Sequence, residues 1–249
     1  MEKRITLLDG AVGTRLWALA DENGISREPV WVYNISHPEL PAQVCGEYAD
    51  AGAEILCANT FSVNRLAVEK VPGYTVDEVV RAAVRIARDT TAGSGKKVAL
   101  DIGPLPEMLE PYGDLEEEDA AACFDEILRS GVEAGADIVF LETFMDAEML
   151  RIAAREAKKY PLPVVCSMSF EKKGRTLMGN TVQDILALLT PLGVDAVGMN
   201  CSLGPEQAIP VIREFADQTD LPLFFKPNAG MPVRGQDGIT MYDCGPERF

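Results

Sequence analysis

The sequence predicts an α/β fold of the (β/α)8 barrel class, the TIM barrel, with its last βα unit missing from this chain. Short apolar segments alternate with segments of helical periodicity along the 249 residues, and one strand-containing unit is repeated. No glycine-rich phosphate loop marks a dinucleotide-binding half, which disfavours the competing architecture, a doubly wound open sheet. We therefore expect residues 1–249 to form one barrel domain that is truncated at its C-terminus.

Seven apolar segments are expected to be strands. Most are nearly continuous apolar runs, which suit parallel strands buried on both faces. They are Ile5–Asp9, Glu54–Asn59, Val98–Ile102, Ile138–Glu142, Val164–Ser169, Ala196–Asn200 and Leu223–Lys226. A closed barrel of this class has eight strands, and seven would leave two unpaired edges. Either the eighth unit is missing from this chain or another chain covers the gap.

The segments between these strands are expected to be helices. They are predicted over Val76–Ala87, over Phe124–Val132, after Asp146, after Thr181 and after Pro205. Thr75 and Glu78 have the spacing of a capping box at the start of the first of these helices. Pro210 is expected to kink or restart the last one, because proline removes a helical hydrogen bond.

An internal repeat supports the barrel over an open sheet. Residues Ala51–Phe61 read AGAEILCANTF and residues Ala134–Phe144 read AGADIVFLETF, and a weaker copy, LGVDAVGMNCS, begins at Leu192. Each copy contains a helix end, a glycine-containing turn, a buried strand and polar residues at the carboxyl end of that strand. Repetition of this unit is typical of a (β/α) barrel.

Composition and charge indicate a globular protein and exclude several classes of partner. The 47% hydrophobic and 25% charged residues are typical of a globular chain. The net charge of −16 repels phosphate backbones and anionic lipids, so we expect no nucleic-acid or membrane partner. No apolar run reaches the length of a membrane span, and the six cysteines show no small-domain disulfide framework. We expect reduced thiols and a cytoplasmic location.

Polar residues follow the expected strands, at the end where the chemistry of (β/α) barrels lies. They are Asp9-Gly10, Asn59-Thr60-Phe61, Asp101 to Pro104, Glu142-Thr143-Phe144, Asn200-Cys201 and Pro227 to Gly230. The set holds acids, amides and one thiol, but no histidine, because the only histidine is His37 in an expected turn.

Each candidate also has a purely structural interpretation. Asp9 is favoured as functional, although it would also suit a turn cap. Glu142 ends a strongly apolar strand and needs a partner, which is either a substrate ammonium or a structural Lys or Arg. Asn59 and Asn200 would equally satisfy loop backbone groups. Cys201 lies where a catalytic thiolate or a metal ligand would lie, but free cysteines are often small buried apolar residues.

Several of these segments resemble the homocysteine S-methyltransferase family. They are LLDGAVGT (7–14), ANTF (58–61), DIGP (101–104), ETF (142–144) and GMNCSLGP (198–205), in the family's order. GRTLMGNT (174–181) and PNAGMP (227–232) resemble the homocysteine-binding module of cobalamin-dependent methionine synthase more than other branches. The motifs extend over nearly the whole chain.

The resemblance implies zinc-dependent methyl transfer to the thiol of homocysteine, giving methionine. Zinc binding would deprotonate the thiol, and only the thiolate attacks a methyl group. The resemblance assigns Cys201 to the metal and to catalysis, and Asp9 and Glu142 to the substrate ammonium. It assigns the backbone amides of Gly10 and Ala11 to the substrate carboxylate. Further substrate contacts are expected from the set Asn59, Thr60 and Asn200. The methyl donor would be a methyl-corrinoid on a separate protein or domain.

One departure from the family pattern is clear. The family takes two further zinc cysteines from a Gly-Gly-Cys-Cys motif after the eighth strand, and this sequence lacks that motif. Cys244 is single and precedes the expected place, so the missing ligands coincide with the missing strand. Two alternatives stay open: a non-catalytic binding subunit whose open barrel a partner completes, and a methyltransferase of the same fold acting on another small thiol.

Overall fold

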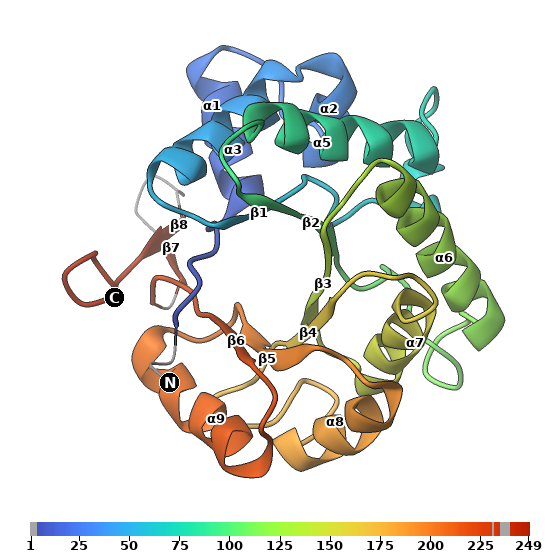
Figure 1. The fold of residues 1–249 in the computed structure, drawn as a ribbon, viewed down its shortest axis with the longest axis vertical. Coiled ribbons are helices and arrows are strands. Elements are labelled where there is room, and N and C mark those ends of the chain that lie inside the picture. Colours follow the sequence, from blue (N-terminus) through green and yellow to red (C-terminus); the bar gives the residue numbers. More distant parts are fainter. Residues whose placement is uncertain (1–3, 231, 235–239) are drawn as a thin grey trace.

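The computed structural model describes residues 4–230, 232–234 and 240–249, and its centre is a curved parallel sheet of six strands (Figure 1). The strands follow one another in chain order across the sheet. They are β1 (Ile55–Cys57), β2 (Lys97–Ile102), β3 (Ile138–Phe144), β4 (Val164–Met168), β5 (Ala196–Asn200) and β6 (Leu223–Lys226). Six of the expected strands and the barrel class of fold are thereby confirmed.

Helices cover the outer face of the curved sheet (Figure 1). They are α1 (Val12–Glu22), α2 (Tyr33–Ser36), α3 (Glu39–Asp50), α4 (Arg65–Val68), α5 (Val76–Thr90), α6 (Glu117–Glu133), α7 (Ala147–Ala157), α8 (Val182–Leu189) and α9 (Pro205–Gln218), with short 3-10 turns at Val30–Val32 and Thr190–Leu192. The capping box of Thr75 and Glu78 is present at α5, and Asp146 caps α7. Helix α9 continues through Pro210, so the expected restart there is wrong.

The first expected strand, Ile5–Asp9, is not a strand in the structure. It makes one parallel bridge, Leu8 to Ile55, and the Asp9 N–H donates to the Ile55 carbonyl at 3.2 Å. Ile5 is 80% exposed, so this segment lacks the burial on both faces that its apolar sequence predicted. The segment nevertheless runs between β1 and β6, where the barrel class requires it (Figure 1).

The core lies between the sheet and the helices, where the apolar faces of α5, α6 and α7 pack on β2 and β3. Gly131 on α6 permits one close approach, because a Cβ there would lie 2.4 Å from Leu100 Cδ2. A second, smaller cluster lies inside the curve of the sheet: Cys57, Ala99, Phe140 and Phe224. The rings of Phe140 and Phe224 meet edge to face at 5.3 Å, which fills the interior between β3 and β6.

Side chains two residues further along these strands form the next inward layer, because alternate residues of a strand share a face. Asp101 follows Ala99, Glu142 follows Phe140, and Lys226 follows Phe224. All the strands are parallel, so this layer lies at their shared carboxyl end. The fold therefore places these three ionisable side chains next to the apolar cluster of Cys57, Ala99, Phe140 and Phe224, on the side of the strands' carboxyl ends.

The remaining strands, β7 (Pro232–Arg234) and β8 (Thr240–Tyr242), form a separate antiparallel pair that the sequence did not lead us to expect. Within the described part of the chain, no helix has both the length and the apolar character needed to cross a membrane.

Candidate active site

Asp9 and Glu142 meet at one cation, the ammonium of Lys226. Lys226 Nζ lies 3.2 Å from Asp9 Oδ1 and 3.5 Å from Glu142 Oε2. Both acids are more than nine-tenths buried, and the lysine side chain is 18% exposed. Of the two partners that the sequence left open for Glu142, a substrate ammonium or a structural Lys or Arg, the structure contains a lysine.

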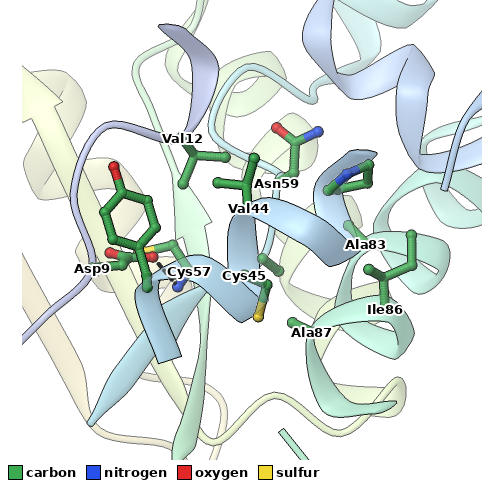
Figure 2. Close-up of a pocket in the computed structure, with 12 residues that line it drawn as sticks. Asp9, Val12, Val44, Cys45, Cys57, Asn59, Ala83, Ile86 and Ala87 are labelled. Atoms are coloured by element: carbon green, nitrogen blue, oxygen red, sulfur yellow. Dashed lines mark hydrogen bonds between the residues drawn. The ribbon is translucent and has the colours of Figure 1, made fainter. Parts of the chain in front are cut away.

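Asp9 is fixed from its other side by the backbone of β1. Its Oδ2 accepts the N–H of Cys57 at 2.6 Å, the contact drawn as a dashed line in Figure 2. This hydrogen bond to a charged acceptor is of the stronger class and holds the carboxylate against the strand end. One oxygen of Asp9 is thus used for positioning, and the other is directed at the cation.

Asp101 adds a third carboxylate to the same layer. Among the described residues, Asp101 Oδ1 and Glu142 Oε2 are buried oxygens without a hydrogen-bond partner. Burial and the neighbouring Glu142 raise the pKa of Asp101 well above its usual value. Burial also raises the pKa of Glu142, although the Lys226 ammonium opposes the shift. Glu142 Oε2 still forms the ion pair with Lys226, so among the described residues Asp101 Oδ1 is the buried oxygen of this layer with neither a hydrogen bond nor an ion pair.

Lys226 stays charged in this setting. Burial alone would lower its pKa, but the surrounding Cys57, Glu142, Asp9 and Asp101 outweigh burial and raise the pKa well above its usual value. The sequence analysis placed Lys226 at the end of an expected strand but did not predict it as a residue of the site. The available signal was a lone lysine ending the apolar strand LFFK, at the same edge as acids that needed a cation.

Asn200 positions the end of β3, where Glu142 lies. Its Oδ1 accepts the Thr143 N–H at 2.8 Å and the Ser167 hydroxyl at 2.7 Å, and its Nδ2 donates to Thr143 Oγ1 at 2.7 Å. Thr143 has a φ of 64°, which is strained for a β-branched residue. The register between β3 and β4 also shifts between Leu141 and Phe144. Such strain collects at functional sites that the surrounding structure holds in place.

Cys201 follows β5 in the same unusual conformation, with a φ of 60°, and Ser202 has a φ of 53°. The Cys201 N–H donates to the Lys226 carbonyl, which ties the thiol-bearing residue to β6. Its thiol is free and partly exposed.

A zinc ion would need more ligands than this thiol. Within the described residues no group of three or more His, Cys, Asp or Glu side chains is arranged to hold a metal ion. Even a catalytic zinc site takes three protein ligands. The described residues therefore do not by themselves fit the zinc ion that the resemblance implies.

Asn59 and Thr60 lie near the mouth, but their side chains bond to protein. Asn59 Nδ2 donates to the Val30 carbonyl at 2.8 Å and to Asn34 Oδ1 at 2.9 Å. Thr60 Oγ1 donates to the Asp101 carbonyl at 2.7 Å. These bonds join the end of β1 to the 3-10 turn at Val30–Val32, to α2 and to β2. Their assignment as substrate contacts stays a prediction.

Gly10 and Ala11 lead into α1. Among the described residues no side chain caps this helix at Ala11, so its N-terminal amides keep their preference for an anion. A Cβ on Gly10 would lie 2.7 Å from the hydroxyl oxygen of Tyr48, which itself donates to the Ala11 carbonyl. Glycine thus allows the close contact with α3 that sets the position of the turn.

A small cavity adjoins Asp9 on the helical side of the sheet, between β1, α3 and α5 (Figure 2). Its lining includes Cys45, Cys57 and Ala87. Its volume of about 10 Å³ accommodates at most one water molecule. This cavity is therefore too small to hold an amino acid.

Comparisons of sequence identify the family to which the chain belongs. A sequence profile of the homocysteine S-methyltransferase family matches residues 6–249, so the chain belongs to this family. Methionine synthase of Mycobacterium leprae is 28% identical over 268 residues, which cover 100% of this chain and 22% of that protein. Methionine synthase of Mycobacterium tuberculosis is 27% identical over 257 residues, with 96% and 21% coverage. The chain thus spans about a fifth of the length of these relatives.

Solved structures agree on the fold. The homocysteine methyltransferase MmuM from Escherichia coli, in its oxidized form, matches with a TM-score of 0.78 and 24% identity, covering 91% of this chain and 83% of that one. Its metallated form matches with a TM-score of 0.77 and 23% identity, covering 92% and 85%. These matches support the barrel class of fold.

Proposed function

We propose that this chain binds homocysteine at the mouth of the barrel and presents its thiol for methylation, giving methionine. The observation that carries the proposal is the convergence of two buried carboxylates, Asp9 and Glu142, on the ammonium of Lys226, whose backbone carbonyl accepts the Cys201 N–H. Methyl transfer needs no general base once the thiolate exists. The proposal is therefore compatible with a chain whose only histidine, His37, lies before α3.

The two charged ends of an amino acid suit different parts of the mouth. Asp9 and Glu142 suit the ammonium, and the N-terminal amides of α1 near Gly10 and Ala11 suit the carboxylate. Asn200 acts in this proposal by holding Thr143, and through it the strand end that bears Glu142. The described residues thereby account for binding and orienting the amino acid.

We further propose that Cys201 supplies one ligand to a zinc ion, as the family resemblance implies. The other ligands would come from outside the described residues. A bound zinc would lower the pKa of the substrate thiol and so supply the nucleophile. The free state of all six cysteines supports a reducing, cytoplasmic setting.

The proposed methyl donor is a methyl-corrinoid carried on a separate protein or domain. The loops that follow β1 to β4 carry large exposed apolar side chains around the mouth. They are Phe61, Met108, Tyr112, Met145, Leu177 and Met178. Exposed apolar residues that gather at one face favour docking of a macromolecule. A small diffusible donor would not require this rim.

A partner-completed barrel is the second candidate. Within the described residues β6 pairs with β5 alone in the parallel sheet, so no second strand pairs with its other edge. A strand from another chain could pair there. A monodisperse, stable monomer in sedimentation experiments would count against this candidate.

The methyltransferase proposal is tested by Cys201→Ala, with Cys123→Ala as the matched control. Cys123 is buried on α6, which covers the outer face of the sheet. We expect Cys201→Ala to abolish both zinc binding and methionine formation from homocysteine, and Cys123→Ala to keep both. Full activity in the Cys201→Ala protein would refute the proposed role of this thiol.

A further inference from the structure

We propose that Lys226 is a resident occupant of the ammonium subsite, which an amino-acid substrate must displace from Asp9 and Glu142 in order to bind. This inference rests on the proposed function, because it takes these two carboxylates as the subsite of the substrate ammonium. It makes Lys226 a residue that sets affinity and specificity.

The geometry gives Lys226 the place of a substrate ammonium. Its Nζ contacts Asp9 Oδ1 at 3.2 Å and Glu142 Oε2 at 3.5 Å. The hydrogen bond from Cys57 N–H and the clamp of Asn200 on Thr143 hold the two carboxylates in position. A second cation cannot take the same atoms while Nζ remains between them.

The Lys226 side chain is able to move away from the two carboxylates. Its side chain is 18% exposed at the mouth, and its four-carbon stem has several rotatable bonds. A third carboxylate, Asp101, lies close enough to interact with it electrostatically. Asp101 Oδ1 is buried without a hydrogen-bond partner among the described residues, so it is a candidate acceptor for the displaced ammonium.

Displacement makes the site selective for ligands that carry their own ammonium. A ligand without an ammonium group cannot replace the ion pairs that Lys226 makes with Asp9 and Glu142. Such a ligand therefore leaves Lys226 in place. The apparent affinity of an amino acid equals its intrinsic affinity multiplied by the fraction of protein whose subsite is vacant, so occupancy by Lys226 lowers it. Removing the lysine charge should therefore increase affinity, and only for ligands that bear an ammonium.

The test compares homocysteine with 4-mercaptobutanoate, which lacks the amino group, by calorimetry at mildly alkaline pH. The thiol is common to both ligands, so its contribution cancels. We expect Lys226→Met to bind homocysteine about tenfold more tightly than the wild type, equivalent to ~1.4 kcal/mol. The affinity for 4-mercaptobutanoate should stay unchanged. Glu142→Gln should weaken homocysteine binding more in the Lys226→Met background than alone, because the lysine no longer competes.

Lys226→Gln serves as a second variant if the methionine variant does not fold. A crystal structure of the wild-type protein with homocysteine needs no variant at all. We expect Lys226 Nζ to have left both carboxylates in that complex. Homocysteine affinity that is unchanged or lower in the variants, an equal gain for both ligands, or a lysine still in place beside bound homocysteine would each overturn the inference. Absence of homocysteine binding in the wild type and in folded variants would instead overturn the proposed function, and the inference with it.

Discussion

Asn200→Ala is the substitution that most sharply separates positioning from direct contact. In the wild type the amide makes three hydrogen bonds, to the Thr143 N–H, the Thr143 hydroxyl and the Ser167 hydroxyl. Asn200 is 4% exposed, so water cannot replace these partners. Alanine would leave a buried backbone N–H without an acceptor and would release the strained backbone of Thr143.

The loss of these three hydrogen bonds determines how far the free energy of unfolding falls. An unsatisfied buried N–H costs about 1–3 kcal/mol, and each of the two hydroxyl contacts is worth about 0.5–1.5 kcal/mol. The free energy of unfolding should therefore fall by about 2–6 kcal/mol. Because Glu142 immediately precedes Thr143, homocysteine affinity should fall as well, at temperatures where the variant is fully folded.

Urea unfolding and homocysteine calorimetry provide the assay, with Asn64→Ala as the control. Asn64 is also buried, and its Oδ1 caps α4 by accepting the Ala67 N–H at 2.9 Å. Loss of this cap should cost about 1 kcal/mol without changing homocysteine affinity. If Asn200→Ala cost no more than Asn64→Ala, or kept full affinity, the clamp described for Asn200 would be refuted.

Three further substitutions test other parts of the mouth. Asp101→Asn mimics the protonated carboxyl that burial and Glu142 favour. A raised folded-state pKa means that wild-type stability falls as pH rises above the ordinary Asp pKa of about 4. The variant should therefore melt higher than the wild type at neutral pH, by a margin that vanishes below that pKa; a margin independent of pH would contradict this. Gly10→Ala should lose about 1–3 kcal/mol in urea unfolding, because its Cβ would lie 2.7 Å from the Tyr48 hydroxyl oxygen; unchanged stability would show that the tyrosine moves freely. Thr143→Gly should lose less stability than Asn200→Ala, because it removes only the Oγ1 hydrogen bond, worth about 0.5–1.5 kcal/mol, and glycine adopts a φ of 64° without strain; a loss as large as that of Asn200→Ala would contradict this.

Local sequence was sufficient for much of the fold. The apolar runs predicted β1 to β6 because burial on both faces leaves a continuous pattern, and the capping box at Thr75 marked the start of α5. The segment Ile5–Asp9 has the same pattern without the same burial, since its one backbone bridge is to β1 and Ile5 is exposed. Sequence pattern alone does not reveal how many neighbours a strand will have.

The sequence predicted the acidic residues of the site, but it did not predict which residues would pair with them. Asp9 and Glu142 follow strand-like runs, which marked them as residues of the mouth. Lys226 was not predictable as a site residue, because the acids that it pairs with are distant in sequence. Asp9, for example, lies 217 residues earlier. The bonds of Asn59 to Asn34 and of Asn200 to Thr143 also depend on the folded arrangement.

The proposed function is tested most directly by comparing methyl transfer to homocysteine with methyl transfer to other small thiols. The protein would be supplied with zinc and with methylcobalamin as the probe donor, and the methylated products would be quantified. We expect methionine formation, with homocysteine preferred over thiols that lack an amino-acid ammonium. Preference for another thiol, or absence of any methylated product from a folded, zinc-loaded protein, would contradict it.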